Sequence, residues 1–406
     1  MTMHMDVRAA AATEAEPKAL SGRAWLWLVL ALAVVGRSVF WNMRPPDMRI
    51  FLEPWFNHIL HYGPVQAFAH PFSNYEPAYL YLLALGSLAH GVMATMTIIK
   101  IISIAGTLFL TLALADVLEA AGAERRGALL LLLLPSVVIN DALLAQCDAL
   151  WAGACLFGLA AMIRGRTLRA MIWCGVAISF KLQAGFMAPV MVGAMIGRKA
   201  PWWQWLVPGA VFLATLVGPW LLGWPGIELL TVYFGQMSLD HIAGRLANPW
   251  MVGTIFAEQP ARHLFFIGYA AAGAVAATVV ALAARQSRNP KLLILLAAIA
   301  GTALPFLLPK MLERYYFLGD VMTLALALSW KRREAAVAVL GVQLASILSH
   351  LSYMYFFDHP YPALAGAVCA AVGLVAMCRL VAPDVEALAT DARAFFEKRK
   401  ANLVEL

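Results

Sequence analysis

The hydrophobic positions of the chain come in runs of about 20 residues that recur from one end to the other. Runs of this length can cross a bilayer as α-helices, which satisfy their own backbone hydrogen bonds in lipid. The composition agrees, because 62% of the residues are hydrophobic and only 13% are charged, whereas a soluble domain is about half apolar and about a quarter charged. The pattern predicts an all-α polytopic membrane protein.

Basic residues in the short segments between the runs indicate the orientation. The clusters are Arg125/Arg126, Arg164/Arg166/Arg169, Arg198/Lys199, Arg285/Arg288/Lys291, Lys331/Arg332/Arg333 and Lys398/Arg399/Lys400. Because Lys and Arg mark the cytoplasmic side, we place these clusters and the N-terminus in the cytoplasm. Pairs of spans then turn outside near residues 140–148, 181–184, 224–261, 310–314 and 355–360. The chain should have about twelve transmembrane helices with both ends inside, and its charge of +7 sets orientation and does not indicate nucleic-acid binding.

The first outer loop, residues 43–96, should hold two helices that do not cross the membrane. Residues 77–92 are apolar, but counting them as a span would move every later basic cluster outside. At about 16 residues they are also marginal for a ~30 Å core, so we interpret them as a short juxtamembrane or re-entrant helix. Residues 48–62 suit a helix in the membrane interface, with an apolar side made by Ile50, Phe51, Trp55, Ile59 and Tyr62.

The two ends of the chain differ from this membrane domain, residues 23–382. Residues 1–22 are polar and Ala-rich and predict a disordered cytoplasmic tail. The apolar run after Arg23 is too long for a cleaved signal peptide and lacks its cleavage pattern. Residues 383–406 predict a cytoplasmic helix, whose Arg393–Lys400 stretch is suited to anionic lipid. The five cysteines show neither metal-ligand nor disulfide spacing and are expected to be mostly buried thiols.

The polar stretch directly after the first hydrophobic run contains Asp47, preceded by Arg44-Pro45-Pro46. A charge at the edge of a bilayer is costly and marks function by default. Asp47 is therefore a candidate catalytic base, with the alternative that it only caps the interfacial helix as its N-cap residue. Glu53 is the second candidate base and is expected to pair with Arg49 at i, i+4.

Four further places put polar groups at outer helix ends: Pro135–Trp151, Phe180–Gln183, Asp240–Trp250 and Pro309–Phe317. They bring the cations Lys181, Arg245, Lys310 and Arg314 to the side of Asp47. Arginine offers a planar fork that suits phosphate, and lysine offers a mobile point charge. The sequence thus predicts an anion site next to a proton acceptor.

Simpler structural roles are open for several of these residues. Arg314 could only pair with Glu313, Lys181 could snorkel to the interface from a helix end, and Asp148 could cap the helix that begins there. His58 and His61 are three residues apart on a helix, but no third ligand is evident, so no metal site is expected.

The motifs also carry a resemblance to a known family. They are Asp47 after the first span, Phe72-Ser73-Asn74-Tyr75-Glu76-Pro77-Ala78-Tyr79-Leu80-Tyr81-Leu82, Gln146-Cys147-Asp148-Ala149-Leu150, Phe180-Lys181-Leu182-Gln183 and Glu313-Arg314-Tyr315-Tyr316-Phe317. In this order, over residues 24–330, the chain resembles GT-C-fold glycosyltransferases, close to the bacterial relatives of the GPI-anchor mannosyltransferases. It departs from them at Ala145, where relatives often have Gly, and at Leu312, where many have His. The second change could alter the sugar or the acceptor.

The resemblance implies a GT-C fold and inverting transfer of a hexose, with mannose as first candidate, from a polyprenyl-phosphate carrier. The acceptor would be a lipid-linked or cell-envelope glycan outside the cytoplasm, at the periplasmic face of a bacterial inner membrane. The sequence contains no Gly-rich phosphate loop, which agrees with a lipid-linked donor rather than a nucleotide sugar. No cofactor is expected.

The resemblance also implies roles for individual residues. Asp47 would be the catalytic base, and Arg314, Arg245, Lys181 and Lys310 would bind the donor phosphate. Substrate-binding roles fall to Gln146, Asp148, Glu313, Tyr75, Glu76, Gln183 and Tyr315. The outer loop 224–261 would close over the donor as a lid.

A transporter or flippase of a lipid-linked saccharide is the alternative. It would also need many spans and a cationic outer pocket. Many transporters, however, show internal repeats and polar groups near the membrane midplane, and the sequence shows no repeat and few polar residues within the spans. A non-catalytic scaffold would leave the one-sided cluster of Asp47 and its cations unexplained.

Overall fold

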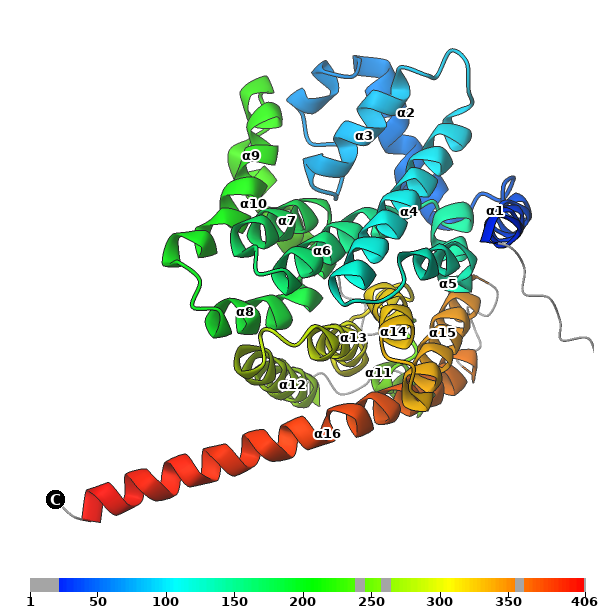
Figure 1. Ribbon diagram of the computed structural model, residues 1–406. Coiled ribbons are helices and arrows are strands. Elements are labelled where there is room, and N and C mark those ends of the chain that lie inside the picture. Colours follow the sequence, from blue (N-terminus) through cyan, green and yellow to red (C-terminus); the bar gives the residue numbers. More distant parts are fainter. Residues whose placement is uncertain (1–21, 238–244, 257–263, 355–360, 405–406) are drawn as a thin grey trace, which may run out of the picture.

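The computed structural model describes residues 22–237, 245–256, 264–354 and 361–404, and these residues form helices joined by turns (Figure 1). The predicted all-α architecture is confirmed. Apolar helices of this kind make the described chain a multi-pass membrane protein. The expected tail before Gly22 lies outside the described residues.

Six helices among the described residues are long and apolar enough to cross a bilayer. They are α4 (Thr95–Ala120), α9 (Val207–Leu222) with its preceding 3₁₀ turn (Trp202–Leu206), α12 (Phe265–Arg285), α13 (Pro290–Leu307), α15 (Arg333–Met354) and the first part of α16 (Tyr361–Val404). A seventh would be the pair Arg125–Leu133 and Pro135–Leu143, which is bent by 60° and contains α5 (Pro135–Val138).

The other expected spans correspond to shorter helices. They are α1 (Gly22–Ser38), α6 (Asp148–Ile163), α7 (Thr167–Phe180), α8 (Ala188–Gly197) with its preceding 3₁₀ turn (Leu182–Met187), and α14 (Phe317–Ser329). Helix length alone therefore does not confirm twelve spans, although the order of the helices in the described residues fits that number.

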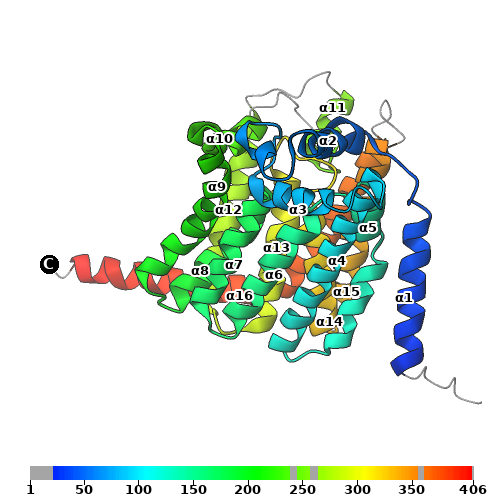
Figure 2. The same ribbon diagram turned by 90° about the horizontal axis from the view of Figure 1, so that it is seen from above.

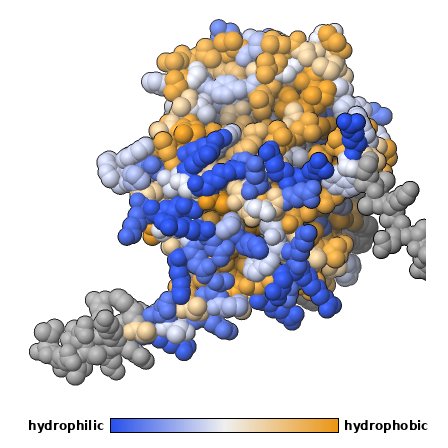
Figure 3. All heavy atoms as spheres, in the orientation of Figure 1, coloured by the Kyte–Doolittle hydropathy of each residue, from blue (hydrophilic) through white to orange (hydrophobic). Residues whose placement is uncertain are grey.

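The helices alternate in direction, so the basic clusters and the polar motifs fall at opposite ends of the bundle. The turns after α4, α6, α8, α12 and α14 carry the basic clusters. Figure 3 shows this end, with hydrophilic side chains gathered across the middle of the face and hydrophobic ones around them. At the other end, α2 (Glu53–Tyr62), α3 (Pro77–Ser87) and α11 (Pro249–Phe256) lie over the helix ends (Figure 2).

The first outer loop forms the two expected short helices. A π-helical turn, Met48–Leu52, precedes α2 and shifts the register of its first residues. The side chains that become buried are Met48, Leu52, Trp55, Phe56 and Ile59. On the predicted apolar side, Ile50 is 62% exposed and Tyr62 is 52% exposed. That this side lies in the membrane interface stays a prediction.

The outer loop 224–261 is partly helical, with α10 (Gly226–Met237) and α11. Residues 238–244 and 257–263 of the predicted lid, and the outer turn 355–360, lie outside the described residues. The helix expected after residue 382 forms the C-terminal part of α16, which continues through Pro383 as one helix of 44 residues, and its cytoplasmic location stays a prediction. The prediction for cysteines holds for Cys147 and Cys155, which are buried, whereas Cys378 is exposed.

Buried polar groups connect helices inside the bundle, where the sequence suggested few. Arg37 of α1 pairs with Asp141 at 2.6 Å and also donates to the Leu132 carbonyl at 2.9 Å. Deeper in the bundle, Ser346 of α15 donates to Asp320 of α14 at 2.6 Å. Since these groups bind one another, they tie helices together and do not by themselves favour a transport path.

The turn that carries Asp47 is fixed by a buried lysine of α4. The Lys100 ammonium donates to the carbonyls of Phe40, Trp41 and Met43 at 2.7, 2.8 and 3.0 Å. Carbonyls that follow the end of α1 lack helical partners, and Lys100 supplies three donors at once. The chain therefore leaves α1 in a defined direction toward Asp47.

Replacing Arg37 by alanine should destabilise the protein by about 3–5 kcal/mol, because Asp141 would be left buried without its cation. The measurement is thermal unfolding of the purified variant in detergent. Arg285→Ala is the matched control, since its pair with Asp391 is solvent-accessible and should be worth less than about 1 kcal/mol. Equal stability of Arg37→Ala and wild type would contradict the role of this pair in holding α1.

Candidate active site

Asp47 lies at the start of the π-helical turn, but its side chain does not cap the helix. Its backbone is helical, with φ −57° and ψ −39°, and it makes no side-chain hydrogen bond to the following backbone. The interpretation as an N-cap alone is therefore wrong. The carboxylate points instead at side chains from three other parts of the chain.

The three contacts of Asp47 are short and cover both carboxylate oxygens. Gln146 donates to Oδ2 at 3.1 Å, and Arg314 lies 3.2 Å from the same atom. Tyr353 donates to Oδ1 at 2.8 Å. The side chain of Asp47 is still 15% exposed, so these contacts do not close it off from solvent.

Gln146 is held in place from both sides. The Tyr75 hydroxyl donates to its Oε1 at 3.1 Å, and the Ser103 hydroxyl donates to its backbone carbonyl. The preceding residue, Ala145, has φ +52°, in the left-handed region that favours glycine. This explains why a glycine suits that position in the resembling proteins and shows that the alanine here keeps the same turn at some cost in strain.

Asp148 and Lys181 form a second, fully buried pair beside Asp47. Their oxygen and nitrogen are 2.7 Å apart, and each side chain is only 3% exposed. Asn140 and Trp151 also donate to Asp148, at 2.9 and 2.8 Å. Burial opposes the charged lysine, but Asp148 outweighs it and raises the pKa of Lys181 above its ordinary value. Neither a snorkelling Lys181 nor a capping Asp148 fits this geometry.

Arg314 connects the Asp47 contacts to the pair of Asp148 and Lys181. It binds Glu313 at 2.5 Å and Asp47 at 3.2 Å, and its Nε lies 4.0 Å from Asp148. Burial raises the pKa of the Glu313 carboxyl, although Arg314 opposes that change. Arg314 therefore pairs with Glu313, which was the simpler role predicted for it, and it also forms an ion pair with Asp47.

The two remaining predicted cations lie on the segments next to Arg314. Arg245 forms a β-bridge with Leu312, which sets it beside the Glu313-Arg314 pair. Lys310 lies earlier in the same loop and is partly buried. Both residues have positive φ values, +68° and +61°, a conformation that is costly for residues other than glycine and is often found at functional sites.

Tyr75 and Glu76 occupy the start of α3 on the other side of Gln146. Lys181 lies over the Tyr75 ring, 5.1 Å from its centroid, and burial raises the pKa of Tyr75 to about 12. Glu76 is fully buried, and among the described residues no partner binds either of its carboxyl oxygens. Burial raises the pKa of Glu76 to about 8, so its carboxyl is protonated at neutral pH.

Several predicted residues lie around this centre or away from it. Gln183 is buried and lies against the hydroxyl of Tyr315. Glu53 pairs with Arg44 at 2.7 Å, not with Arg49 as predicted, because the π-helical turn changes the spacing before α2. His58 hydrogen bonds with the Ala67 carbonyl, and the described chain holds no group of three residues suited to a metal.

Three contact residues of the centre were missed from the sequence: Tyr353, Asn140 and Trp151. Asn140 and Trp151 lie within a motif that was singled out, so their spacing of eight residues before and three after Asp148 could have suggested them. Tyr353 lies at the end of α15, 306 residues from Asp47. It follows Ser349, His350 and Ser352, so polar residues at this helix end are the signal that could have found it.

The centre therefore combines an accessible carboxylate with buried cations at the outer end of the bundle. A carboxylate held by fixed donors can accept a proton from a hydroxyl. Cations held in a poorly hydrated place can stabilise negative charge on a leaving group. Proton abstraction next to a departing anion is the chemistry that this arrangement can perform.

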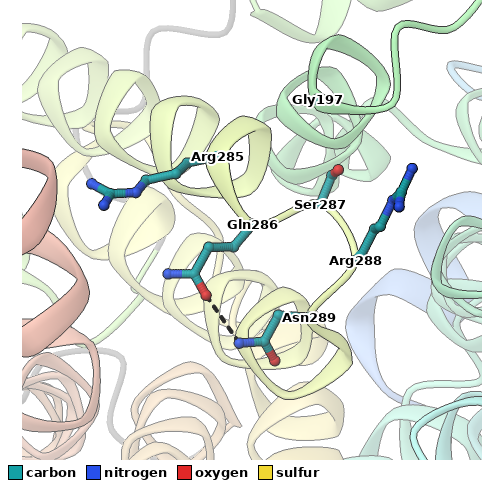
Figure 4. Close-up of a pocket in the computed structure, with 6 residues that line it drawn as sticks. All are labelled: Gly197, Arg285, Gln286, Ser287, Arg288 and Asn289. Carbon is teal, nitrogen blue, oxygen red and sulfur yellow. Dashed lines mark hydrogen bonds between the residues drawn. The ribbon is translucent and has the colours of Figure 1, made fainter.

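A hollow of about 450 Å³ lies at the opposite end of the molecule, between Gly197 and the turn after α12 (Figure 4). Its polar side chains are engaged with neighbours. Asn289 donates to Gln286 at 3.0 Å, Gln286 donates to Asp384 at 2.5 Å, and Arg285 pairs with Asp391 at 2.8 Å. The ion pair of Arg285 with Asp391 is exposed to solvent, unlike the buried cations beside Asp47, so we assign this hollow no chemistry.

Comparison with known proteins supports the fold. Among solved structures, the chain is similar to ArnT from Cupriavidus metallidurans bound to undecaprenyl phosphate. The TM-score is 0.51 at 17% identity, over 88% of this chain and 77% of ArnT. At this identity the likeness shows the fold, and the predicted GT-C architecture is confirmed. No family model matches the sequence, and no curated protein matches it.

Replacing Glu76 by glutamine should stabilise the protein at neutral pH but not at pH 4.5. Its pKa of about 8 in the folded protein exceeds the value of about 4.3 for a solvated glutamate. Between these values the unfolded chain releases a proton that the folded one keeps, so the glutamate costs stability as pH rises. Thermal unfolding should show a gain on the order of 3 kcal/mol at pH 7. The same gain at both pH values would contradict a protonated Glu76.

Proposed function

We propose that the protein is an inverting glycosyltransferase that moves a hexose from a polyprenyl-phosphate carrier to a lipid-linked or cell-envelope glycan. Mannose is the first candidate for the sugar. The observation that carries the proposal is Asp47, an accessible carboxylate held by Arg314, Gln146 and Tyr353 in a fold shared with a protein whose bound ligand is undecaprenyl phosphate.

In the proposed reaction, Asp47 takes the proton of the acceptor hydroxyl as the acceptor oxygen attacks the anomeric carbon. The bond between that carbon and the phosphate oxygen breaks, and the carrier phosphate leaves with the electron pair. Attack from the side opposite the leaving group inverts the configuration at the anomeric carbon. Neighbouring cations stabilise the charge that develops on the phosphate.

The balance of charge in the centre suggests which cations serve the phosphate. Lys181 and Arg314 face three acidic side chains, those of Asp47, Asp148 and Glu313. An approaching phosphate would therefore gain little from these two cations alone. Arg245 and Lys310, which flank the Glu313-Arg314 segment, would complete the site, and Arg245 would do so from the proposed lid that includes α10.

Tyr75, Gln146, Gln183 and Tyr315 surround this centre and would contact the sugar or the acceptor. The proposal places the centre at the periplasmic face of a bacterial inner membrane, since the basic clusters occupy the other end of the bundle and Lys and Arg mark the cytoplasmic side.

The test is transfer by the purified protein in detergent, with radiolabelled polyprenyl-phosphate-mannose as donor and a membrane lipid extract as acceptor. Wild type should move label into a new glycolipid. Asp47→Asn should lower the rate by roughly 100-fold or more, since general-base catalysis contributes about 10² to 10⁴. Arg288→Ala, which changes a cation at the opposite end, should leave transfer unchanged.

Two results would count against the proposal. If Asp47→Asn and Arg314→Ala both kept the wild-type rate, the mechanism would be wrong even if transfer occurred. If mannose, glucose and arabinose carriers all gave no transfer, a transporter of lipid-linked saccharides would become the better candidate.

A further inference from the structure

The two oxygens of the Asp47 carboxylate have unequal surroundings. Oδ2 accepts a hydrogen bond from Gln146 at 3.1 Å and lies in an ion pair with Arg314 at 3.2 Å. Oδ1 accepts one from the Tyr353 hydroxyl at 2.8 Å. Each oxygen of a carboxylate has two lone pairs. Among the described residues, the cation therefore lies beside Oδ2, whereas Oδ1 is contacted by a neutral donor and keeps a lone pair for a further one.

The orientation of this carboxylate depends on side chains from other elements. Asp47 makes no hydrogen bond to the backbone that follows it, so its own helix does not fix its rotamer. Gln146 is itself fixed by Tyr75, and Arg314 by Glu313. Gln146, Arg314 and Tyr353 therefore fix the orientation of a side chain that would otherwise rotate.

The position of Tyr353, which donates to Oδ1, is itself fixed by the packing of α15. It lies on α15, whose preceding turns are anchored by Ser346, bound to Asp320 of α14 at 2.6 Å. Ser349 on the same stretch accepts a hydrogen bond from the Ala247 backbone N–H at 2.9 Å. The end of α15 is therefore held against the bundle, and the phenol reaches Asp47 from a stable position.

We propose that Oδ1 is the atom that accepts the proton and that Tyr353 is the positioning residue that holds it. This inference rests on the proposed function. The acceptor hydroxyl donates its proton to the remaining lone pair of Oδ1, its oxygen forms the bond to the anomeric carbon, and the phosphate leaves with the electrons of the broken bond. Tyr353 keeps its own proton and its hydrogen bond to Oδ1.

The experiment compares Tyr353→Phe with wild type in the transfer assay at neutral pH. The expected result is a kcat lowered about 10- to 100-fold, the loss that one hydrogen bond to a charged group gives, with an unchanged KM for the donor. Tyr361→Phe is the matched control, because Tyr361 is 67% exposed. A wild-type kcat, or a loss that appears in KM instead of kcat, would overturn the proposal.

A second measurement decides the inference without any substrate. Melting temperatures of wild type, Asp47→Asn, Tyr353→Phe and the double variant form a cycle. If Tyr353 holds Asp47, the double variant should melt higher than the sum of the two single effects predicts. Additive effects would overturn the contact, whereas coupling without transfer would leave it intact and reject only the proposed function.

Discussion

The structure depends on the need to pair every charge that the apolar bundle takes out of water. An unpaired buried ion costs several kcal/mol, and only a close partner with good geometry offsets that cost. Arg314 meets the need of two acidic groups at once, Glu313 at 2.5 Å and Asp47 at 3.2 Å, and it approaches Asp148, the partner of Lys181. The outer ends of several helices are consequently locked to one another by electrostatics.

The same constraint explains how a partly exposed carboxylate is held in place there. Asp47 is 15% exposed, yet Lys100 fixes the turn before it and Gln146 fixes its side chain. Fixed dipoles and charges need no rearrangement when charge moves during a reaction. The polar network is thus both the support of the outer end and the preorganised environment of the centre.

Much of this arrangement could be predicted because charge within apolar sequence is conspicuous. Asp47, Asp148, Lys181 and Arg314 were selected as polar groups at outer helix ends, and the structure brings them together. The failures have local causes. The π-helical turn at Met48–Leu52 gives Glu53 a different partner from the one that regular α-helical spacing predicts. Tyr353 was missed because an aromatic residue at the end of an apolar helix also fits lipid or core packing.

Two features could not be predicted from the sequence pattern: the bend between Arg125–Leu133 and Pro135–Leu143, and the continuity of α16. A Pro at residue 135 can begin a helix after a 60° bend, as here, whereas Pro383 lies inside a helix that continues. The difference is made by neighbours. Ser136, next to the first proline, is bound by Gln343 of α15, while Asp384, next to the second, receives a bond from Gln286 of the turn after α12.

The hydrogen bond between Tyr353 and Asp47 joins residues 306 positions apart in the chain. During synthesis, Asp47 leaves the ribosome long before Tyr353 exists. The carboxylate can receive its full set of donors only after the last helices have been inserted and packed. A chain that ended before Tyr353 would contain Asp47 without this hydrogen bond, so the geometry of the carboxylate depends on a residue that is synthesised 306 positions later.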